Sequence, residues 1–266
     1  VGAANTLTTL AGIPFYQGGT GSIYTHDVSG TDDSALSNTA YGITAMDAIT
    51  TGDDNVAIGT GALGVNTTGA SNTAVGREAL RDNTTASNNV AVGQGALAVN
   101  TTGTRNIAIG SGAYDASDTE NDNMAIGHQS MDANTAGGTK NIALGNFALD
   151  ALTSGDSNIG IGYNANGAIT TGGANIAIGD DALLANTDGS NNVVIGANAL
   201  HTATSVGNIV AIGHNALTAS TTGHSNTAVG YLALETHTTG HYNTALGREA
   251  LQTNTTGGEN TAVGYQ

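Results

Sequence analysis

Short runs of alternating apolar residues recur along this chain, and each run ends on a glycine. In the run 55–59, which reads Asn-Val-Ala-Ile-Gly, Val56 and Ile58 are separated by a small residue, Ala57. Such a run is too short for a helix, and its period of two is that of a β-strand. Val56 and Ile58 would share one face of the strand and Ala57 would take the other. The pattern predicts many short strands, each closed by what we call an anchor glycine.

The anchor glycines are evenly spaced. Fourteen anchors define thirteen intervals, of which twelve are 17 residues long and one, with an extra glycine at Gly137–Gly138, is 18. The anchors are Gly42, Gly59, Gly76, Gly93, Gly110, Gly127, Gly145, Gly162, Gly179, Gly196, Gly213, Gly230, Gly247 and Gly264. A fixed period of this kind is the signature of a solenoid. We therefore predict an all-β, parallel β-solenoid of about fourteen 17-residue coils.

Other positions repeat as strictly as the anchors. Four residues before the anchor, Asn occurs in thirteen of fourteen repeats, with Ile209 as the exception; two before it, Ala occurs in twelve of fourteen. In a parallel stack each residue lies over its equivalent in the next coil, about 4.8 Å away, and stacked side-chain amides hydrogen-bond along the column. The predicted structural ladder comprises Asn55, Asn72, Asn89 and Asn106, with the anchors Gly59, Gly76, Gly93 and Gly110.

The second half of each repeat offers one large apolar residue and a turn. Ala62-Leu63 is followed by Asn66-Thr67-Thr68-Gly69, in which Asn folds onto its own backbone and Gly supplies a positive φ. We expect two short strands and two turns per coil, with a short helical turn over Ala62-Leu63 as the alternative. The repeat region is 38–266, truncated within its last coil. Residues 1–37, which hold the only proline, Pro14, are expected to form an N-terminal cap or connector.

Composition narrows the possible functions. Five Lys and Arg stand against 21 Asp and Glu, for a net charge of −16, so few cations are available to neutralise phosphates and we expect no nucleic-acid partner. No apolar run approaches the length of a membrane span, so we expect no direct membrane insertion. A repeat places the same residue on every coil, whereas an active site needs one distinct constellation. We therefore expect no enzyme activity and no cofactor.

The repeats resemble known surface fibres. The segments 72–76 (Asn-Thr-Ala-Val-Gly) and 226–234 (Asn-Thr-Ala-Val-Gly-Tyr-Leu-Ala-Leu) resemble bacteriophage tail-fibre repeats, and 55–59 is similar to the head repeats of trimeric autotransporter adhesins. The resemblance covers 38–266, although adhesin heads use shorter repeats. It implies a left-handed β-roll, three chains per fibre, and host attachment from a virion or bacterial cell surface, hence an extracellular location. The recurrent alanines favour the same homotrimer, because a position facing solvent would not require a small residue.

Residues that break the consensus are candidate receptor contacts. They are Tyr114, Tyr163, His201, Tyr231 and Tyr242. Aromatic rings suit stacking on a host-surface glycan, and simple surface decoration is the alternative. His224 and His241 hold equivalent positions in successive coils, so their side chains should stack, as a surface ladder or as part of an ion site. The acidic pairs Asp32-Asp33, Asp53-Asp54 and Asp180-Asp181 fit exposed turns or calcium binding.

An ice-binding solenoid is a further alternative from a different functional class. Thr lies eight residues after the anchor in twelve of thirteen coils, often followed by a second Thr, as in Thr67-Thr68. Adjacent residues of a strand point to opposite faces, so this pair would not form one flat array. We therefore expect no ordering of ice.

Overall fold

The computed structural model describes residues 9–10, 13–14, 23–24, 34–133 and 137–265. The chain divides into two compact units, Val1–Thr119 and Glu120–Gln266. Most of the segment 1–37, expected to be a cap, lies outside the described residues. Its described part holds an antiparallel pair, β1 (Thr9–Leu10) with β2 (Ile13–Pro14), and a strand β3 (Ile23–Tyr24) that pairs in parallel with the first repeat strand.

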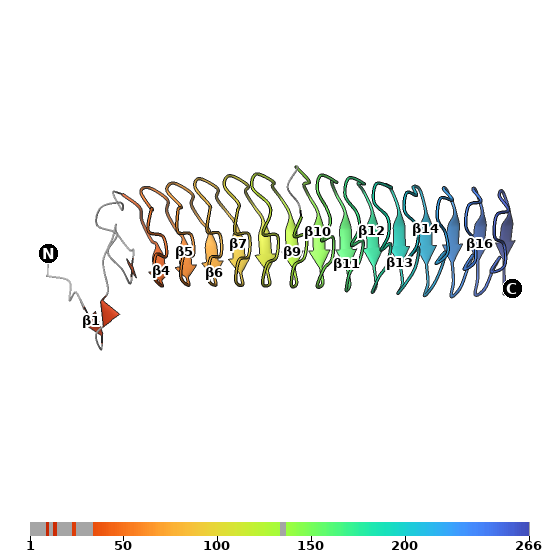
Figure 1. The fold of residues 1–266 in the computed structure, drawn as a ribbon, viewed down its shortest axis with the longest axis horizontal. Coiled ribbons are helices and arrows are strands. Elements are labelled where there is room, and N and C mark those ends of the chain that lie inside the picture. Colours follow the sequence, from red (N-terminus) through yellow and green to blue (C-terminus); the bar gives the residue numbers. More distant parts are fainter. Residues whose placement is uncertain (1–8, 11–12, 15–22, 25–33, 134–136, 266) are drawn as a thin grey trace. The chain divides into compact units, whose positions relative to one another are not determined.

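The repeats form one three-residue strand each, and within each unit the strands lie side by side in parallel (Figure 1). In the first unit these are β4 (Thr39–Tyr41), β5 (Val56–Ile58), β6 (Thr73–Val75), β7 (Val90–Val92) and β8 (Ile107–Ile109). In the second unit they are β9 (Met124–Ile126), β10 (Ile142–Leu144), β11 (Ile159–Ile161), β12 (Ile176–Ile178), β13 (Val193–Ile195), β14 (Val210–Ile212), β15 (Thr227–Val229), β16 (Thr244–Leu246) and β17 (Thr261–Val263). The predicted all-β, parallel β-solenoid is confirmed.

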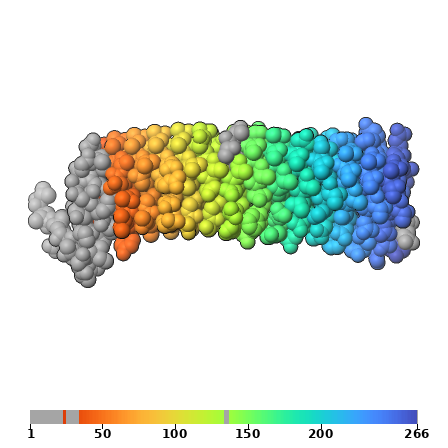
Figure 2. Space-filling model, viewed as in Figure 1, coloured from red at the N-terminus to blue at the C-terminus, as the bar shows by residue number. Residues whose placement is uncertain are grey.

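The strand register follows the sequence period. Ala57 pairs with Ala74, and Val56 with Thr73, each 17 residues on. At the extra glycine the register becomes 18, with Met124 opposite Ile142. Each residue therefore lies over its equivalent in the next coil, and Figure 2 shows successive coils of each unit packed directly against one another.

The Ala-Leu segment differs from both structures expected for it. Ala62 N donates to Gly59 O at 3.2 Å, which closes a tight turn, and Leu63 N donates to Ala79 O of the next coil at 3.1 Å. Leu63 has a φ of 50°, in the left-handed region, which neither a strand nor a right-handed helix permits. This side of the coil is thus a row of turns, joined to the next coil by backbone hydrogen bonds such as those that Leu63 N and Val65 N donate.

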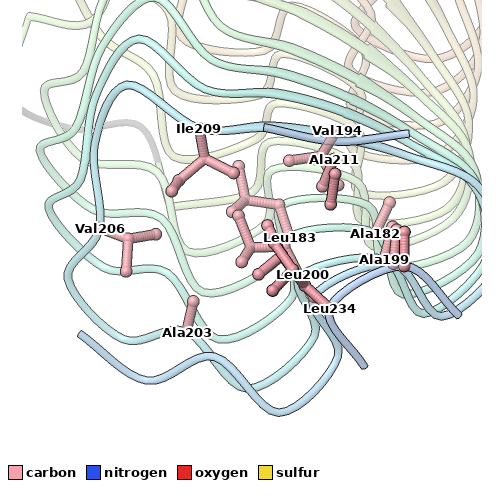
Figure 3. Packing of buried hydrophobic residues seen from close by; sticks show 14 of the residues in the cluster. Ala182, Leu183, Val194, Ala199, Leu200, Ala203, Val206, Ile209, Ala211 and Leu234 are labelled. Carbon is pink, nitrogen blue, oxygen red and sulfur yellow. The ribbon is translucent and has the colours of Figure 1, made fainter. Parts of the chain in front are cut away.

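The coil interior is filled by alanine and leucine. Ala57, Ala62 and Leu63 are fully buried, and the same columns are buried in the following coils. In the second unit Leu183, Leu200 and Leu234 lie inside the coil together with Val194 and Ala211 (Figure 3). The two sides of a coil meet here: a Cβ added at Gly160, in the alanine column, would lie 3.1 Å from Leu149 Cγ. The interior is therefore narrow, which explains the small residues.

This packing corrects the interpretation of the recurrent alanines. The alanine two residues before each anchor was expected at an interface between chains, but it lies in the core of its own coil. The outward residues of each strand are instead the large aliphatic ones: Val56 is half-buried and Ile58 is 41% exposed. The predicted alternation along the strand is confirmed. The small residue faces inward and the two large residues face outward, which is the opposite of what residue size suggests.

Candidate functional site

The asparagines of the predicted structural ladder are buried and linked to one another. Asn72 N donates to Asn55 Oδ1 at 2.9 Å, Asn89 N to Asn72 Oδ1 at 3.0 Å, and Asn106 N to Asn89 Oδ1 at 2.9 Å. The amide nitrogens close the adjoining turn, as Asn72 Nδ2 does by donating to Ala86 O at 2.8 Å. Each of these side chains thus joins two coils and fixes a turn. At Ile209, the exception, the backbone N–H still donates to Asn192 Oδ1 at 3.0 Å, but no side chain continues the ladder.

The anchor glycines have a backbone conformation that other residues rarely adopt. Gly59, Gly76, Gly93 and Gly110 have φ values of 133°, 139°, 134° and 139°. At the first three, an added Cβ would collide with the carbonyl group of the next coil's anchor. The anchor column is therefore required by both conformation and space.

A second asparagine ladder, seven residues after the anchor, was interpreted from sequence only as a turn. Asn66, Asn83 and Asn100 are fully buried, and Asn83 Nδ2 donates to Asn66 Oδ1 at 2.9 Å. Asn66 Nδ2 also donates to Gly69 O of its own turn at 2.9 Å. The recurrence of Asn at this position was the available signal. These amides are therefore structural links between the coils and within the turns.

One coil breaks the leucine column with a polar residue. Asn166 occupies the position of Leu149 and Leu183 and is fully buried, and neither its Oδ1 nor its Nδ2 has a hydrogen-bond partner. Its φ of 53° matches the 54° and 55° of those leucines. A buried amide without partners costs free energy that an apolar side chain of the same shape does not.

We expect Asn166→Leu to stabilise the fold. Removing the unsatisfied amide and restoring the leucine column should raise the free energy of unfolding by about 1–2 kcal/mol, measured by urea denaturation. The exposed Thr171→Leu is the matched control, because it adds an apolar side chain outside the core. An unchanged or lower stability in Asn166→Leu would contradict the expectation.

The outward residues of the strands in each unit, β4–β8 in the first and β9–β17 in the second, form two uncharged columns that we call the strand face. All are Val, Ile, Leu, Met, Thr or Tyr, and most are aliphatic, in a chain of net charge −16. Several in the column next to the anchor are well exposed, among them Ile58 (41%), Ile161 (36%) and Leu246 (48%). Within each unit the strand face is therefore an uncharged, mainly aliphatic surface on the outside of the coil, suited to contact with a partner.

The candidate receptor contacts fall into different environments. Tyr114 is fully buried because it fills the leucine column, so the expectation that it contacts a receptor is wrong. Tyr163 and Tyr242 are 53% and 66% exposed, and His201 is half-buried. Of the five, Tyr163 and Tyr242 have the most accessible side chains.

Tyr231 is 45% exposed, but its ring is covered on its faces. The His214 ring stacks on it with centroids 5.7 Å apart and planes 16° apart, and the Arg248 guanidinium lies 5.4 Å from its centroid. The side chains of the neighbouring coils therefore leave only the edge of the ring facing solvent. Tyr231 presents an edge and a hydroxyl, not the open face that stacking on a sugar requires.

His224 and His241 stack as expected, with ring centroids 5.7 Å apart and planes 3° apart. The acidic pair Asp32-Asp33 lies outside the described residues. In the other two pairs, Asp53 Oδ1 accepts a hydrogen bond from Leu36 N at 2.7 Å, and Asp181 Oδ1 accepts one from Asn164 Nδ2 at 3.2 Å. Within the described residues no three His, Cys, Asp or Glu side chains converge as ligands for one metal ion. These groups therefore act here as links between coils.

Two carboxyl groups show opposite pKa shifts. The hydrogen bonds from Arg81 lower the pKa of Asp82, with Arg81 Nε 2.8 Å from Asp82 Oδ1. Burial raises the pKa of Asp150, and the negative charge of Asp132 in the equivalent position of the preceding coil adds to this. Both pairs lie on the turn side of the coil, away from the strand face.

The threonine columns lie in a turn and not in a strand. Thr67 is half-buried, and its hydroxyl donates to Thr84 O at 3.0 Å; Thr84 and Thr170 make the same bond to the next coil, at 3.2 and 2.9 Å. Thr68 is exposed. The hydroxyls of these first threonines therefore donate to backbone carbonyls of the next coil, and they do not form a regular array of free hydroxyls.

Comparison with family models, curated proteins and solved structures gave no match. A search of the described residues for a helix of sufficient length and hydropathy to cross a bilayer found none.

Proposed function

We propose that this chain is a structural segment of an extracellular attachment fibre, assembled as a homotrimer through the strand face. The observation that carries the proposal is the uncharged, mainly aliphatic strand face of each unit, along β4–β8 and along β9–β17. The coils supply a rigid scaffold with repeated positions for recognition. A phage tail fibre on a virion is the bearer we favour, and the head or stalk of a bacterial trimeric adhesin is the alternative.

The size and charge of the strand face support association. In the second unit, nine strands at about 4.8 Å spacing and about 10 Å wide give a strip of roughly 430 Å². This equals the largest apolar patch on a typical soluble monomer, which covers roughly 300–600 Å² and is often functional. A chain of net charge −16 repels its copies elsewhere, whereas the strand face brings no charges together. Three copies meeting along this face would remove it from water.

Sedimentation equilibrium tests the assembly. We expect the wild type to sediment at three times the chain mass of 26.1 kDa. The triple variant Ile161→Glu, Ile178→Glu and Ile195→Glu should sediment as a monomer that keeps its circular dichroism spectrum, because it buries three carboxylates per chain at the interface.

The matched control adds the same charge away from the strand face. Thr171→Glu, Ser205→Glu and Thr222→Glu change exposed residues in turns of the same unit and should remain trimeric. A well-folded wild-type monomer, or dissociation of both triple variants, would contradict the role given to the strand face.

For recognition we propose a host-surface glycan held by the exposed aromatic side chains Tyr163 and Tyr242. Because their side chains are 53% and 66% exposed, they can reach a ligand outside the coil. A glycan array should show binding by the wild type and at least about tenfold weaker binding by Tyr163→Ala with Tyr242→Ala, the loss of stacking contacts. Tyr41→Ala, equally exposed at 53% but on the strand face, is the control and should keep its glycan binding. Equal binding by all three proteins would count against the assignment.

A further inference from the structure

Two residues before the ladder asparagine, each coil turns a corner, and there the backbone N–H often points at a side chain of the next coil. We call this position the corner column. Its acceptors include Asp53, Ser87, Asp156 and Ser190, which take hydrogen bonds from Leu36 N (2.7 Å), Ala70 N (3.0 Å), Thr139 N (2.7 Å) and Gly173 N (3.0 Å). The corner is thus closed by whichever acceptor the sequence places there.

At two successive corners the acceptor is histidine. Gly207 N donates to His224 Nδ1 at 2.9 Å, and His224 N donates to His241 Nδ1 at 3.0 Å. A ring nitrogen accepts only while it carries no proton, so both imidazoles must be neutral with the proton on Nε2. Both histidines are exposed, so protons reach them directly.

We infer that His224 and His241 form an acid-sensitive latch between these coils. Histidine changes its charge between about pH 5 and 8. The added proton goes to Nδ1, which then turns from acceptor to donor, and the amides of Gly207 and His224 lose their partners. Two imidazolium rings with centroids 5.7 Å apart also repel each other. The latch is therefore closed at neutral pH and opens as the pH falls.

The other titratable residues beside the two histidines are Tyr242 and Glu259. The Tyr242 ring lies 6.2 Å from the His241 ring, centroid to centroid. Gly258 holds the corner column in the following coil and has no side chain, and beside it the exposed Glu259 contacts His241 through Glu259 N, which donates to His241 O at 2.9 Å. Ser190, in the coil before Gly207, does not titrate.

A nearby histidine has the opposite environment, which determines the choice of measurement. His237 is fully buried, and its ring nitrogens face Asn254 O at 3.1 Å and Gly240 O at 2.8 Å. Asn226 Nδ2 also lies 3.5 Å from His237 Nε2. A global melting temperature would report on His237 together with the two corner histidines, whereas a measurement at individual amides reports on each corner separately.

The test is residue-resolved amide hydrogen exchange on the full chain at pH 8 and pH 5, expressed as protection relative to the intrinsic rate at each pH. Protection at Gly207 and His224 should fall about fivefold or more in acid, the loss of one hydrogen bond. Ala70 and Gly173, bonded to serine hydroxyls in the same column, should not change. Nitrogen NMR of the two rings at pH 8 should show the proton on Nε2.

The double variant His224→Ser and His241→Ser supplies the acceptor used at Ser87 and Ser190. Its protection at Gly207 and residue 224 should be the same at both pH values. The proposal is overturned if wild-type protection does not depend on pH, if the double variant keeps the acid-induced loss, or if either ring carries its proton on Nδ1 at pH 8.

Discussion

Gly76→Ala should unfold the coils around β6. Gly76 has a φ of 139°, which is outside the regions open to residues with a side chain, and an added Cβ would collide with the Gly93 carbonyl of the next coil. Backbone atoms of a stacked coil cannot move aside as a flexible side chain can. We expect the free energy of unfolding to fall by about 3 kcal/mol or more, measured by urea denaturation followed by circular dichroism.

The control for this substitution is Gly95→Asn. Gly95 has a φ of 66°, in the left-handed region that Asn tolerates, and an added Cβ would have no atom within 4 Å. The chain itself places Asn164, Asn198 and Asn215 at the equivalent position with φ between 53° and 57°. Gly95→Asn should therefore change the stability little. Equal stability of Gly76→Ala and Gly95→Asn would show that the anchor conformation is not required.

The period, the register and the columns could be predicted from the sequence, because in a parallel stack like residues lie over like. The 18-residue interval, with its extra glycine at Gly137–Gly138, also predicted the change of register between β9 and β10. The same argument gave the stack of His224 on His241. These inferences depend only on the spacing of residues along the chain.

The direction in which the strand faces could not be predicted in this way. Alternation separates Val56 and Ile58 from Ala57, and burial of the larger residues is the usual expectation. Here the coil is too narrow for two large side chains, so the leucine column fills the interior and alanine packs against it. The outcome depends on the width of the coil, into which Leu63 and its equivalents point from a backbone of positive φ. Nothing in a single repeat indicates that a leucine will adopt this conformation.

The same reasoning explains the misplaced receptor contact. Tyr114 breaks the consensus, and so do Tyr163 and Tyr242. Tyr114, however, lies in the leucine column and is buried, whereas the other two lie at outward positions. A departure from the consensus therefore indicates exposure only when its column is known to face outward. For Tyr231 the decisive factor is the neighbouring coils, since His214 and Arg248 cover its ring.

The asparagine ladder gives the second large effect that we expect. Replacing Asn72, Asn89 and Asn106 together by Ala removes three buried amides, and the N–H groups that they accept from lose their partners. At about 1–3 kcal/mol for each unsatisfied site the total is roughly 3–9 kcal/mol. Because each backbone N–H donates to the side chain of the preceding ladder residue, the three sites are neighbours and their effects are not expected to be additive. Thermal unfolding should show a markedly lower midpoint.

A control in the same coils separates the ladder from a general effect of alanine. Thr68, Thr85 and Thr102 are exposed, and each lies one residue after a threonine whose hydroxyl bonds the next coil. Their triple replacement by Ala removes three side chains from the turn and none from the ladder, so we expect a small shift of the midpoint. If the two triple variants have the same midpoint of thermal unfolding, the ladder asparagines contribute no more to stability than exposed turn residues do. The cohesion of the coils would then come from the backbone hydrogen bonds and the alanine–leucine core.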